Sequence, residues 1–156
     1  ILSHAATKSL LFISAIGLTD VSKGSRKFQD LTGAAYRHKI AGIGFTVGSL
    51  SMVGMPLFSG FVSKLLFAQA SIGHAYKMLP ALIVLGISTI LNAIYFMKTV
   101  IRIFVPERRS DCEVITIKSE KTYALTIVLF IALNIALGML SQPIVEWIKM
   151  GLDMFA

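Results

Sequence analysis

A chain of 156 residues, 55% of them hydrophobic and with a mean hydropathy of +0.76, is too apolar for an ordinary soluble domain. Its formal net charge of +7 does not require a nucleic-acid partner, because the basic residues are not interleaved with aromatic ones and cluster at the ends of apolar runs. The composition therefore predicts an integral, polytopic membrane protein of the all-α class.

Four apolar runs predict four transmembrane helices, since each can cross a hydrocarbon core of roughly 30 Å at about 1.5 Å per residue. The expected spans cover about residues 1–18, 39–72, 77–105 and 122–148, so that residues 1–156 form a single membrane domain. The chain begins at Ile1, already inside an apolar run. We therefore expect it to be the C-terminal part of a longer subunit.

The first span carries two titratable side chains, His4 and Lys8, which lie four residues apart and share one helix face. An ionisable group inside a span is costly unless it is solvated or paired, so it indicates a function by default. Because histidine titrates near physiological pH, the pair is a candidate relay that passes protons through water. The plainer alternative is a histidine that only hydrogen-bonds a neighbouring helix.

The second span is interrupted by the sequence "GMPLFSGFVSK", residues 54–64. Pro56 has no N–H to give a helix, and Gly54 and Gly60 loosen the backbone on either side, so we expect the helix to break at Pro56. Freed backbone groups at membrane depth need protein or water as partners. The serine side chains close to the break can bind these groups or hold water there, namely Ser49, Ser51, Ser59 and Ser63.

Lys64 follows Pro56 by about two helical turns and still precedes the apolar sequence "LLFAQASIG". Loss of water around a lysine disfavours its charged form, which is what a group that loads and releases a proton requires. Broken helices at the membrane midplane are a recurrent basis of ion sites in transporters. The alternative is a proline kink beside a lysine that extends its side chain towards the surface.

The third and fourth spans contain fewer side chains that could take part in proton transfer. Lys98 lies one turn before Arg102 and is expected to reach the membrane surface with its amine. Asn92 and Asn134 lie mid-span and are expected to hydrogen-bond between helices. The sequence contains no nucleotide-binding loop, metal-ligand cluster or catalytic triad. We therefore predict no catalytic residue, no cofactor and no metal in this chain.

The distribution of Lys and Arg predicts the orientation, since basic residues gather in cytoplasmic loops. The loops after the first and third spans, with their edges, hold Lys23, Arg26, Lys27, Arg37, Lys39, Arg102, Arg108, Arg109, Lys118 and Lys121. The opposite side has only Lys77 and Lys149. The two basic loops are therefore expected in the cytoplasm and the C-terminus outside the cell (inner) membrane.

Three segments carry a resemblance to a known family: "LSHAATKSLLFISAIG", "DLTGAAYRHKIAGIGFTVGSLSMVGMPLFSGFVSK" and "LNAIYFMKTVIRIF". They resemble the C-terminal part of the antiporter-like membrane subunits of respiratory complex I (NADH:quinone oxidoreductase), Mrp-type sodium/proton antiporters and hydrogenases related to hydrogenase-4. The resemblance implies that Lys64 lies at the lysine of the second broken helix, the terminal protonation site, and that His4 and Lys8 feed it. It further implies partners in a multi-subunit complex.

The favoured function is therefore translocation of protons, or exchange of sodium and protons, as part of such a subunit in the lipid bilayer. The chain is not itself expected to be catalytic, although its complex would be a redox-driven NADH:quinone oxidoreductase or hydrogenase, or an Mrp antiporter. The alternative is a non-conducting structural or assembly subunit in which the break only shapes helix packing. A membrane enzyme is disfavoured, because no catalytic acid or metal cluster lies near a span end.

Overall fold

The computed structural model describes residues 1–25, 27–72, 75–106 and 121–153. These residues form helices and short connections and include no strand, so the predicted all-α class is confirmed for them. The helices are α1 (Leu2–Asp20), α2 (Ala34–Arg37), α3 (Lys39–Val53), α4 (Ser59–Ile72), α5 (Ala75–Phe104), α6 (Lys121–Met139) and α7 (Ser141–Asp153).

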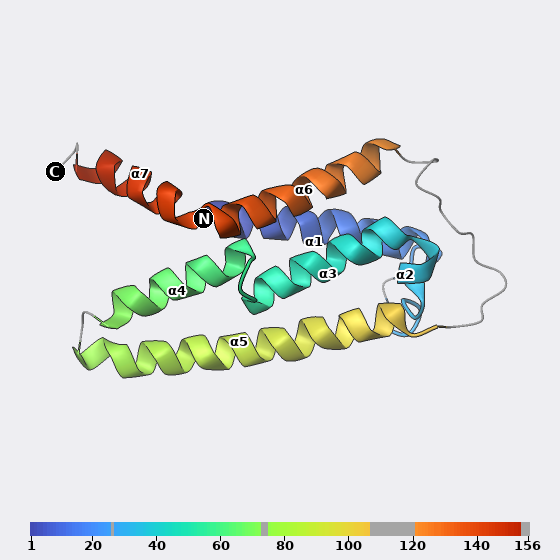
Figure 1. The fold of residues 1–156 in the computed structure, drawn as a ribbon. Helices are drawn as coiled ribbons and strands as arrows, with labels where there is room; N and C mark the ends of the chain where they lie inside the picture. The colour runs from blue at the N-terminus through green and yellow to red at the C-terminus, as the bar shows by residue number, and fades with distance from the viewer. Residues whose placement is uncertain (26, 73–74, 107–120, 154–156) are drawn as a thin grey trace.

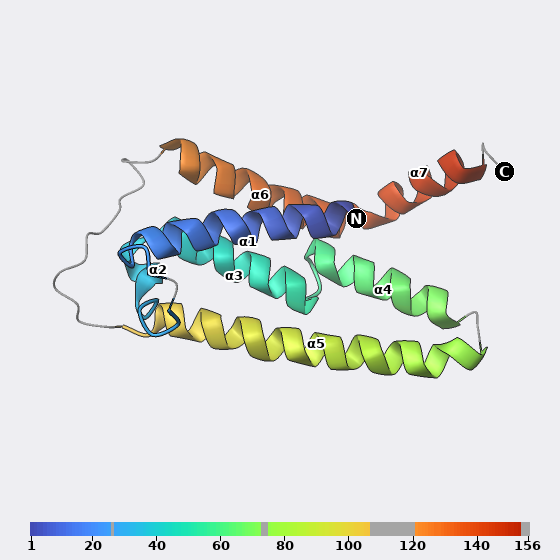
Figure 2. The same ribbon diagram turned by 180° about the vertical axis from the view of Figure 1, so that it is seen from behind.

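The longest helix, α5, is the support along which the others are arranged (Figures 1 and 2). Its 30 residues correspond to about 45 Å of helix. Helices α3 and α4 follow one another along it, and both pack against it. Helices α1 and α6 pack on α3 in one half of the molecule, whereas α7 continues into the half that contains α4.

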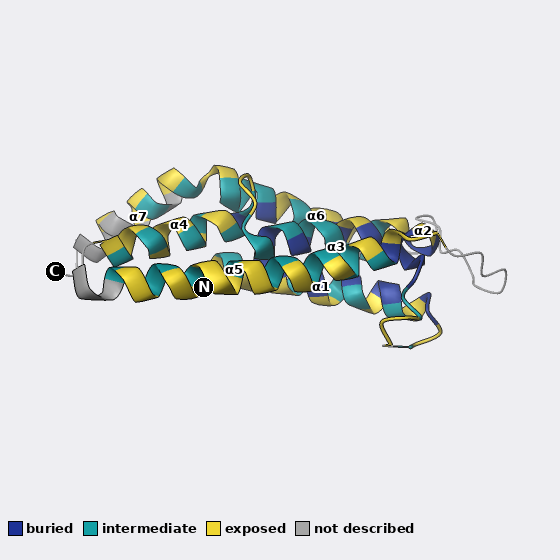
Figure 3. Cartoon of the chain, turned by 90° about the horizontal axis from the view of Figure 1, so that it is seen from below, coloured by how far each residue is buried: buried dark blue, intermediate teal, exposed yellow. Residues whose placement is uncertain are grey.

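Two helices of the described chain are long and apolar enough to cross a membrane: Met78–Phe104, within α5, and Lys121–Met139, which is α6. Helix α3 is apolar but shorter, so the count of four spans stays a prediction. Large apolar side chains of α5 are exposed in this chain, among them Ile87, Leu91 and Ile94. In Figure 3, α5 is drawn mostly in the colours of exposed and intermediate residues. Such a surface suits lipid or neighbouring protein rather than water.

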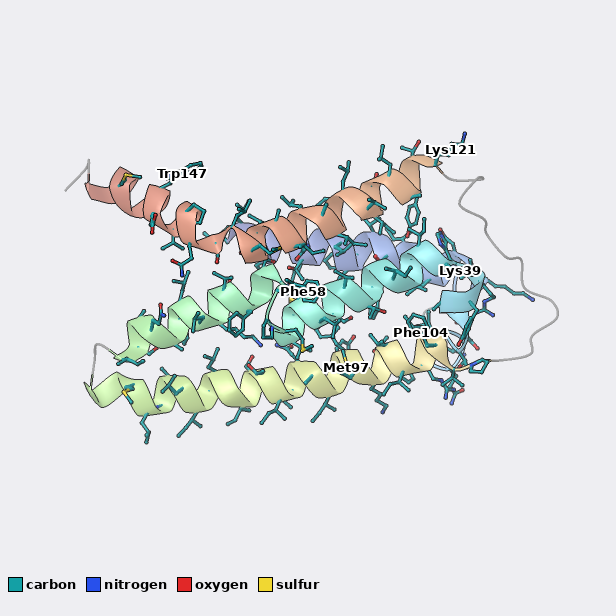
Figure 4. The ribbon with its side chains drawn as sticks, viewed as in Figure 1. Lys39, Phe58, Met97, Phe104, Lys121 and Trp147 are labelled. Atoms are coloured by element: carbon teal, nitrogen blue, oxygen red, sulfur yellow. The ribbon has the colours of Figure 1, made fainter. Side chains whose placement is uncertain are left out.

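The second predicted span, residues 39–72, is two helices rather than one. Helix α3 ends at Val53, the connection covers residues 54–58, and α4 begins at Ser59. Pro56 lies within this connection. Phe58, labelled in Figure 4, marks the place where the two helices meet beside the middle of α5.

The prediction of one helix over residues 122–148 is wrong, since α6 ends at Met139 and α7 begins at Ser141. The Leu140 N–H still donates to the carbonyl of Ala136 at 2.8 Å. Pro143 explains why the ladder stops, because it has no N–H to offer to the preceding turn. Proline is tolerated in the first turn of a helix, and that is where α7 places it.

The end of the bundle opposite α4 and α7 has a small apolar core formed by Leu18, Val21, Ala34, Ala35, Ala41 and Ile103. The Tyr123 hydroxyl of α6 donates to the Ile13 carbonyl of α1 at 2.8 Å. Buried Arg37 donates to the Ser22 hydroxyl at 3.2 Å and to the Thr32 carbonyl at 3.3 Å. Helix α2 and the preceding loop are thus tied to the ends of α1, α3 and α5, which the sequence alone did not predict.

Candidate functional site at the α3–α4 break

The backbone of the break is defined by two residues with positive φ. Gly54 has φ 90° and ends α3 in a left-handed conformation, with its N–H shared between the carbonyls of Leu50 (3.1 Å) and Ser51 (3.0 Å). Leu57 has φ 95°, a conformation that L side chains rarely adopt. Gly54 therefore provides the left-handed turn that glycine makes without steric cost. The chain then turns through Pro56 and restarts as α4.

Lys64 of α4 connects the two halves of the break with a third helix. Its ammonium donates to the Val53 carbonyl at 2.8 Å and to the Thr89 hydroxyl of α5 at 2.9 Å. The Val53 carbonyl is in the last turn of α3, where helix termination leaves carbonyls without intrahelical partners. Both acceptors are neutral oxygens. Lys64 thus donates a hydrogen bond to a backbone carbonyl that the helix break leaves without an intrahelical partner.

The side chain of Lys64 lies directly against Gly54. A Cβ at position 54 would be 2.9 Å from the lysine Cδ and 3.3 Å from both Cε and Nζ. The missing side chain of Gly54 is therefore the space that the lysine stem occupies. Gly54 therefore has two roles: it adopts the left-handed turn that ends α3, and it leaves room for the Lys64 side chain.

A cluster of four buried polar side chains, here called the Asn134 cluster, holds the same break from the other side. Its members are Thr7 of α1, Ser51 of α3, Ser59 of α4 and Asn134 of α6, each no more than 1% exposed. The Asn134 Oδ1 accepts from Thr7 at 2.7 Å, from Ser59 at 2.9 Å and from Ser51 at 3.1 Å. The cluster joins four helices at one point.

Two glycines allow the backbone around the Asn134 cluster to pack closely. A Cβ on Gly60 would collide with the carbonyl oxygen of Ser51, and a Cβ on Gly138 would collide with that of Leu57. The start of α4 therefore lies on the end of α3, and the last turn of α6 lies on the connection itself. Gly60 also donates its N–H to the Ser51 hydroxyl at 3.3 Å.

His4 and Lys8 lie away from the α3–α4 break. Both are exposed on α1, whereas Thr7, which precedes Lys8 in the chain, is turned inward into the Asn134 cluster. Within the described residues, the hydrogen bonds of Lys64 run to α3 and α5 and not to α1. The structure therefore brings Lys64, Gly54 and Pro56 to one place and leaves His4 and Lys8 on an open helix face.

Thr89 is the residue of this site that the sequence analysis missed. Its only signal was a polar side chain within an otherwise apolar span, next to Ser88 and one turn from Asn92. Nothing in that pattern indicates which of the three faces Lys64. The partnership depends on how α4 and α5 pack side by side, which spacing along one helix does not reveal.

Comparison with known families bears on the same region, because the matched segment contains the whole break. The sequence profile of the family described as NADH:quinone oxidoreductase/Mrp antiporter, TM, matches residues 1–99. The chain belongs to this family. The match includes α1, the α3–α4 break with Lys64, and most of α5 with Thr89. The antiporter-like resemblance of the sequence is thereby confirmed, and with it the membrane-bound character of the protein.

Individual antiporter-like relatives come from all three kinds of complex. NADH-quinone oxidoreductase subunit N of Saccharopolyspora erythraea is 24% identical over 97% of this chain and 29% of its own length. The hydrogenase-4 component F homolog of Methylacidiphilum infernorum is 32% identical over 58% of this chain and 19% of its own. Na(+)/H(+) antiporter subunit A1 of Staphylococcus haemolyticus is 29% identical over 94% of this chain and 20% of its own.

The chain thus spans less than a third of the length of each of these relatives. No solved structure matches it.

Proposed function

We propose that this chain is the part of an antiporter-like membrane subunit in which Lys64 takes up and releases the translocated proton. The observation that carries the proposal is the position of Lys64, whose amine joins the end of α3 to the middle of α5 across a broken helix. A charged group inside a membrane protein is costly and indicates a function by default. Family membership supports the same assignment.

The chemistry of the site suits a proton more than a strongly bound metal ion. Among the described residues, both hydrogen-bond partners of Lys64 are neutral oxygens, and neither fixes the amine in its charged form. Lysine readily changes protonation when it is removed from water. We propose that His4 and Lys8 of α1 deliver protons towards Lys64 through water, with the rest of the subunit covering their exposed face.

The partners and orientation follow from the same assignment. The relatives are named as subunits of NADH-quinone oxidoreductases, hydrogenase-4 and Na(+)/H(+) antiporters, so we propose that this chain works beside other membrane subunits in one such complex. The transported ion is then a proton, or a proton exchanged for sodium. Lys39 and Lys121 lie at one end of the bundle (Figure 4), which supports basic loops in the cytoplasm and a C-terminus outside.

The second candidate is a non-conducting structural subunit. One observation favours it: the Asn134 cluster and the close backbone contacts of Gly60 and Gly138 hold the break firmly, as a purely architectural kink would require. In that case the two hydrogen bonds of Lys64 only satisfy free oxygens. A side chain of similar length without charge would then preserve transport.

The test is proton translocation by the intact complex in sealed vesicles, comparing the natural subunit with Lys64→Met. Lys98→Met is the matched control, since Lys98 is exposed and its amine lies 5.6 Å from the centre of the Phe28 ring, away from the break. We expect Lys64→Met to lower translocation by at least tenfold in an assembled complex, and Lys98→Met to leave it unchanged. Full translocation by Lys64→Met would establish the structural role instead.

A further inference from the structure

We propose that Thr89 is a positioning residue: together with the Val53 carbonyl, it fixes the orientation of the Lys64 amine, so that the third tetrahedral position of the nitrogen faces the path of the proton. This inference rests on the proposed role of Lys64 as a proton carrier. It adds a residue from α5, a helix that does not contain the break. The contact that carries it is the 2.9 Å hydrogen bond from Lys64 Nζ to Thr89 Oγ1.

The direction of this hydrogen bond is set by a second one. Thr89 Oγ1 donates to the Leu85 carbonyl, one turn earlier in α5, at 2.8 Å. A hydroxyl has a single proton, so towards Lys64 the threonine oxygen offers only lone pairs. The Val53 carbonyl has no proton at all. As long as the Thr89 proton stays on the Leu85 carbonyl, Lys64 faces two acceptors.

This polarity is compatible with both protonation states of the amine. An ammonium has three N–H donors, and a neutral amine has two N–H donors and one lone pair. Two fixed acceptors are satisfied by two N–H groups in either state. The amine keeps its place when a proton leaves, and the third tetrahedral position alone changes from N–H to lone pair. The released proton passes to a water molecule, which becomes hydronium and carries it onward.

The methylene groups of the Lys64 side chain are confined as well, so the third tetrahedral position of its nitrogen has a defined direction. Lys64 Cδ, Cε and Nζ all lie close to the open side of Gly54, and the amine is held between α3 and α5. Without the Thr89 oxygen, the amine would keep one anchor and could rotate about the Val53 carbonyl. Proton transfer through water requires an aligned donor and acceptor, so a rotating amine transfers less often.

Substitution of Thr89 tests this role, because valine keeps the branched shape and removes the acceptor. Thr99→Val is the matched control: Thr99 lies on the same helix and makes the same kind of bond, to the Tyr95 carbonyl at 3.0 Å. The intact complex in sealed vesicles is compared as the natural subunit, Thr89→Val, Thr89→Ser, Thr99→Val and Lys64→Met. Assembly is measured in parallel from the yield of purified complex.

We expect Thr89→Val to lower proton translocation about tenfold, the size expected for losing one hydrogen bond to a charged group. Thr89→Ser restores the hydroxyl and is expected to restore transport, whereas Thr99→Val has no effect. Rescue by serine separates positioning from packing, since serine lacks the methyl group that valine retains.

The outcomes separate this inference from the function on which it rests. Loss of transport in Lys64→Met together with normal transport in Thr89→Val would overturn the role of Thr89 and leave that of Lys64. Normal transport in Lys64→Met would overturn the proposed function itself. A loss in Thr89→Val that serine does not rescue would show that an acceptor oxygen at position 89 is not enough to restore transport, which also overturns the inference.

Discussion

The amide oxygen of Asn134 accepts a hydrogen bond from the Thr7 hydroxyl at 2.7 Å, joining α6 to α1 between residues 127 positions apart in the chain. Ser51 and Ser59 donate to the same oxygen from the two helices that flank the break. A carbonyl oxygen has two lone pairs, so at most two of these three hydroxyls can bond it well at one time. The remaining hydroxyl bonds within the cluster, where Thr7 lies 3.0 Å from Ser51.

Replacing Asn134 with leucine should destabilise the helix bundle, because the buried hydroxyls of the cluster lose the acceptor that at most two of them use at one time. A buried polar group left unsatisfied costs about 1–3 kcal/mol, although interhelical hydrogen bonds in membranes average nearer 0.6 kcal/mol. We therefore expect about 1 kcal/mol, measured as the free energy of unfolding in detergent micelles. Thr126→Val on the same helix is the control, since among the described residues Thr126 bonds within its own helix, to the Thr122 carbonyl at 2.9 Å. Equal effects of the two substitutions would contradict a special role for the cluster.

Gly54→Ala should disturb the break and the lysine together. The φ of 90° is unfavourable for alanine by about 1–2 kcal/mol, and the new methyl group would lie 2.9 Å from Lys64 Cδ. We expect both lower stability and lower proton translocation in the assembled complex.

Gly86→Ala is the control for that experiment. Gly86 is helical, within α5, and its added Cβ meets nothing within 4 Å. Alanine in a helix interior is favoured over glycine by about 0.5–1 kcal/mol, so this variant should be neutral or slightly more stable. If Gly54→Ala behaved like Gly86→Ala in both measurements, the steric account of the break would be wrong.

Gly138→Ala should weaken the contact between α6 and the connection of residues 54–58. Its methyl group would collide with the Leu57 carbonyl oxygen, which belongs to the backbone and cannot rotate away. Overpacking of this kind costs about 1–3 kcal/mol. The measurement is the midpoint of thermal unfolding of the purified subunit complex, with Gly86→Ala again for comparison. An unchanged midpoint would mean that α6 moves freely away from the break.

Lys8→Met tests whether the exposed face of α1 takes part in proton delivery. If His4 and Lys8 supply Lys64 through water, removal of the Lys8 amine should lower translocation severalfold while the bundle remains stable, because the Lys8 side chain is exposed in this chain. Lys23→Met, in the loop after α1, is the control. Equal translocation by both variants would remove α1 from the path, and Lys64 would need another source of protons.

The sequence by itself determined the all-α class, the membrane character and the family, because these depend on composition, the lengths of apolar runs and local motifs. It also drew attention to residues 54–64, since proline and glycine act on the backbone wherever they stand. Its prediction of a single helix over residues 122–148 failed, because hydropathy does not register the turn at Leu140.

Only the tertiary structure decided which polar residues meet. Thr89 faces Lys64 because α5 runs alongside α4, and Asn134 reaches Thr7 because α6 packs on α1. His4 and Lys8 share the predicted helix face, yet the packing of α1 leaves that face open and turns Thr7 inward. The spacing of residues along a helix predicts which side chains share a face. Which helix packs against that face depends on contacts between segments distant in the chain, and the local sequence does not determine these contacts.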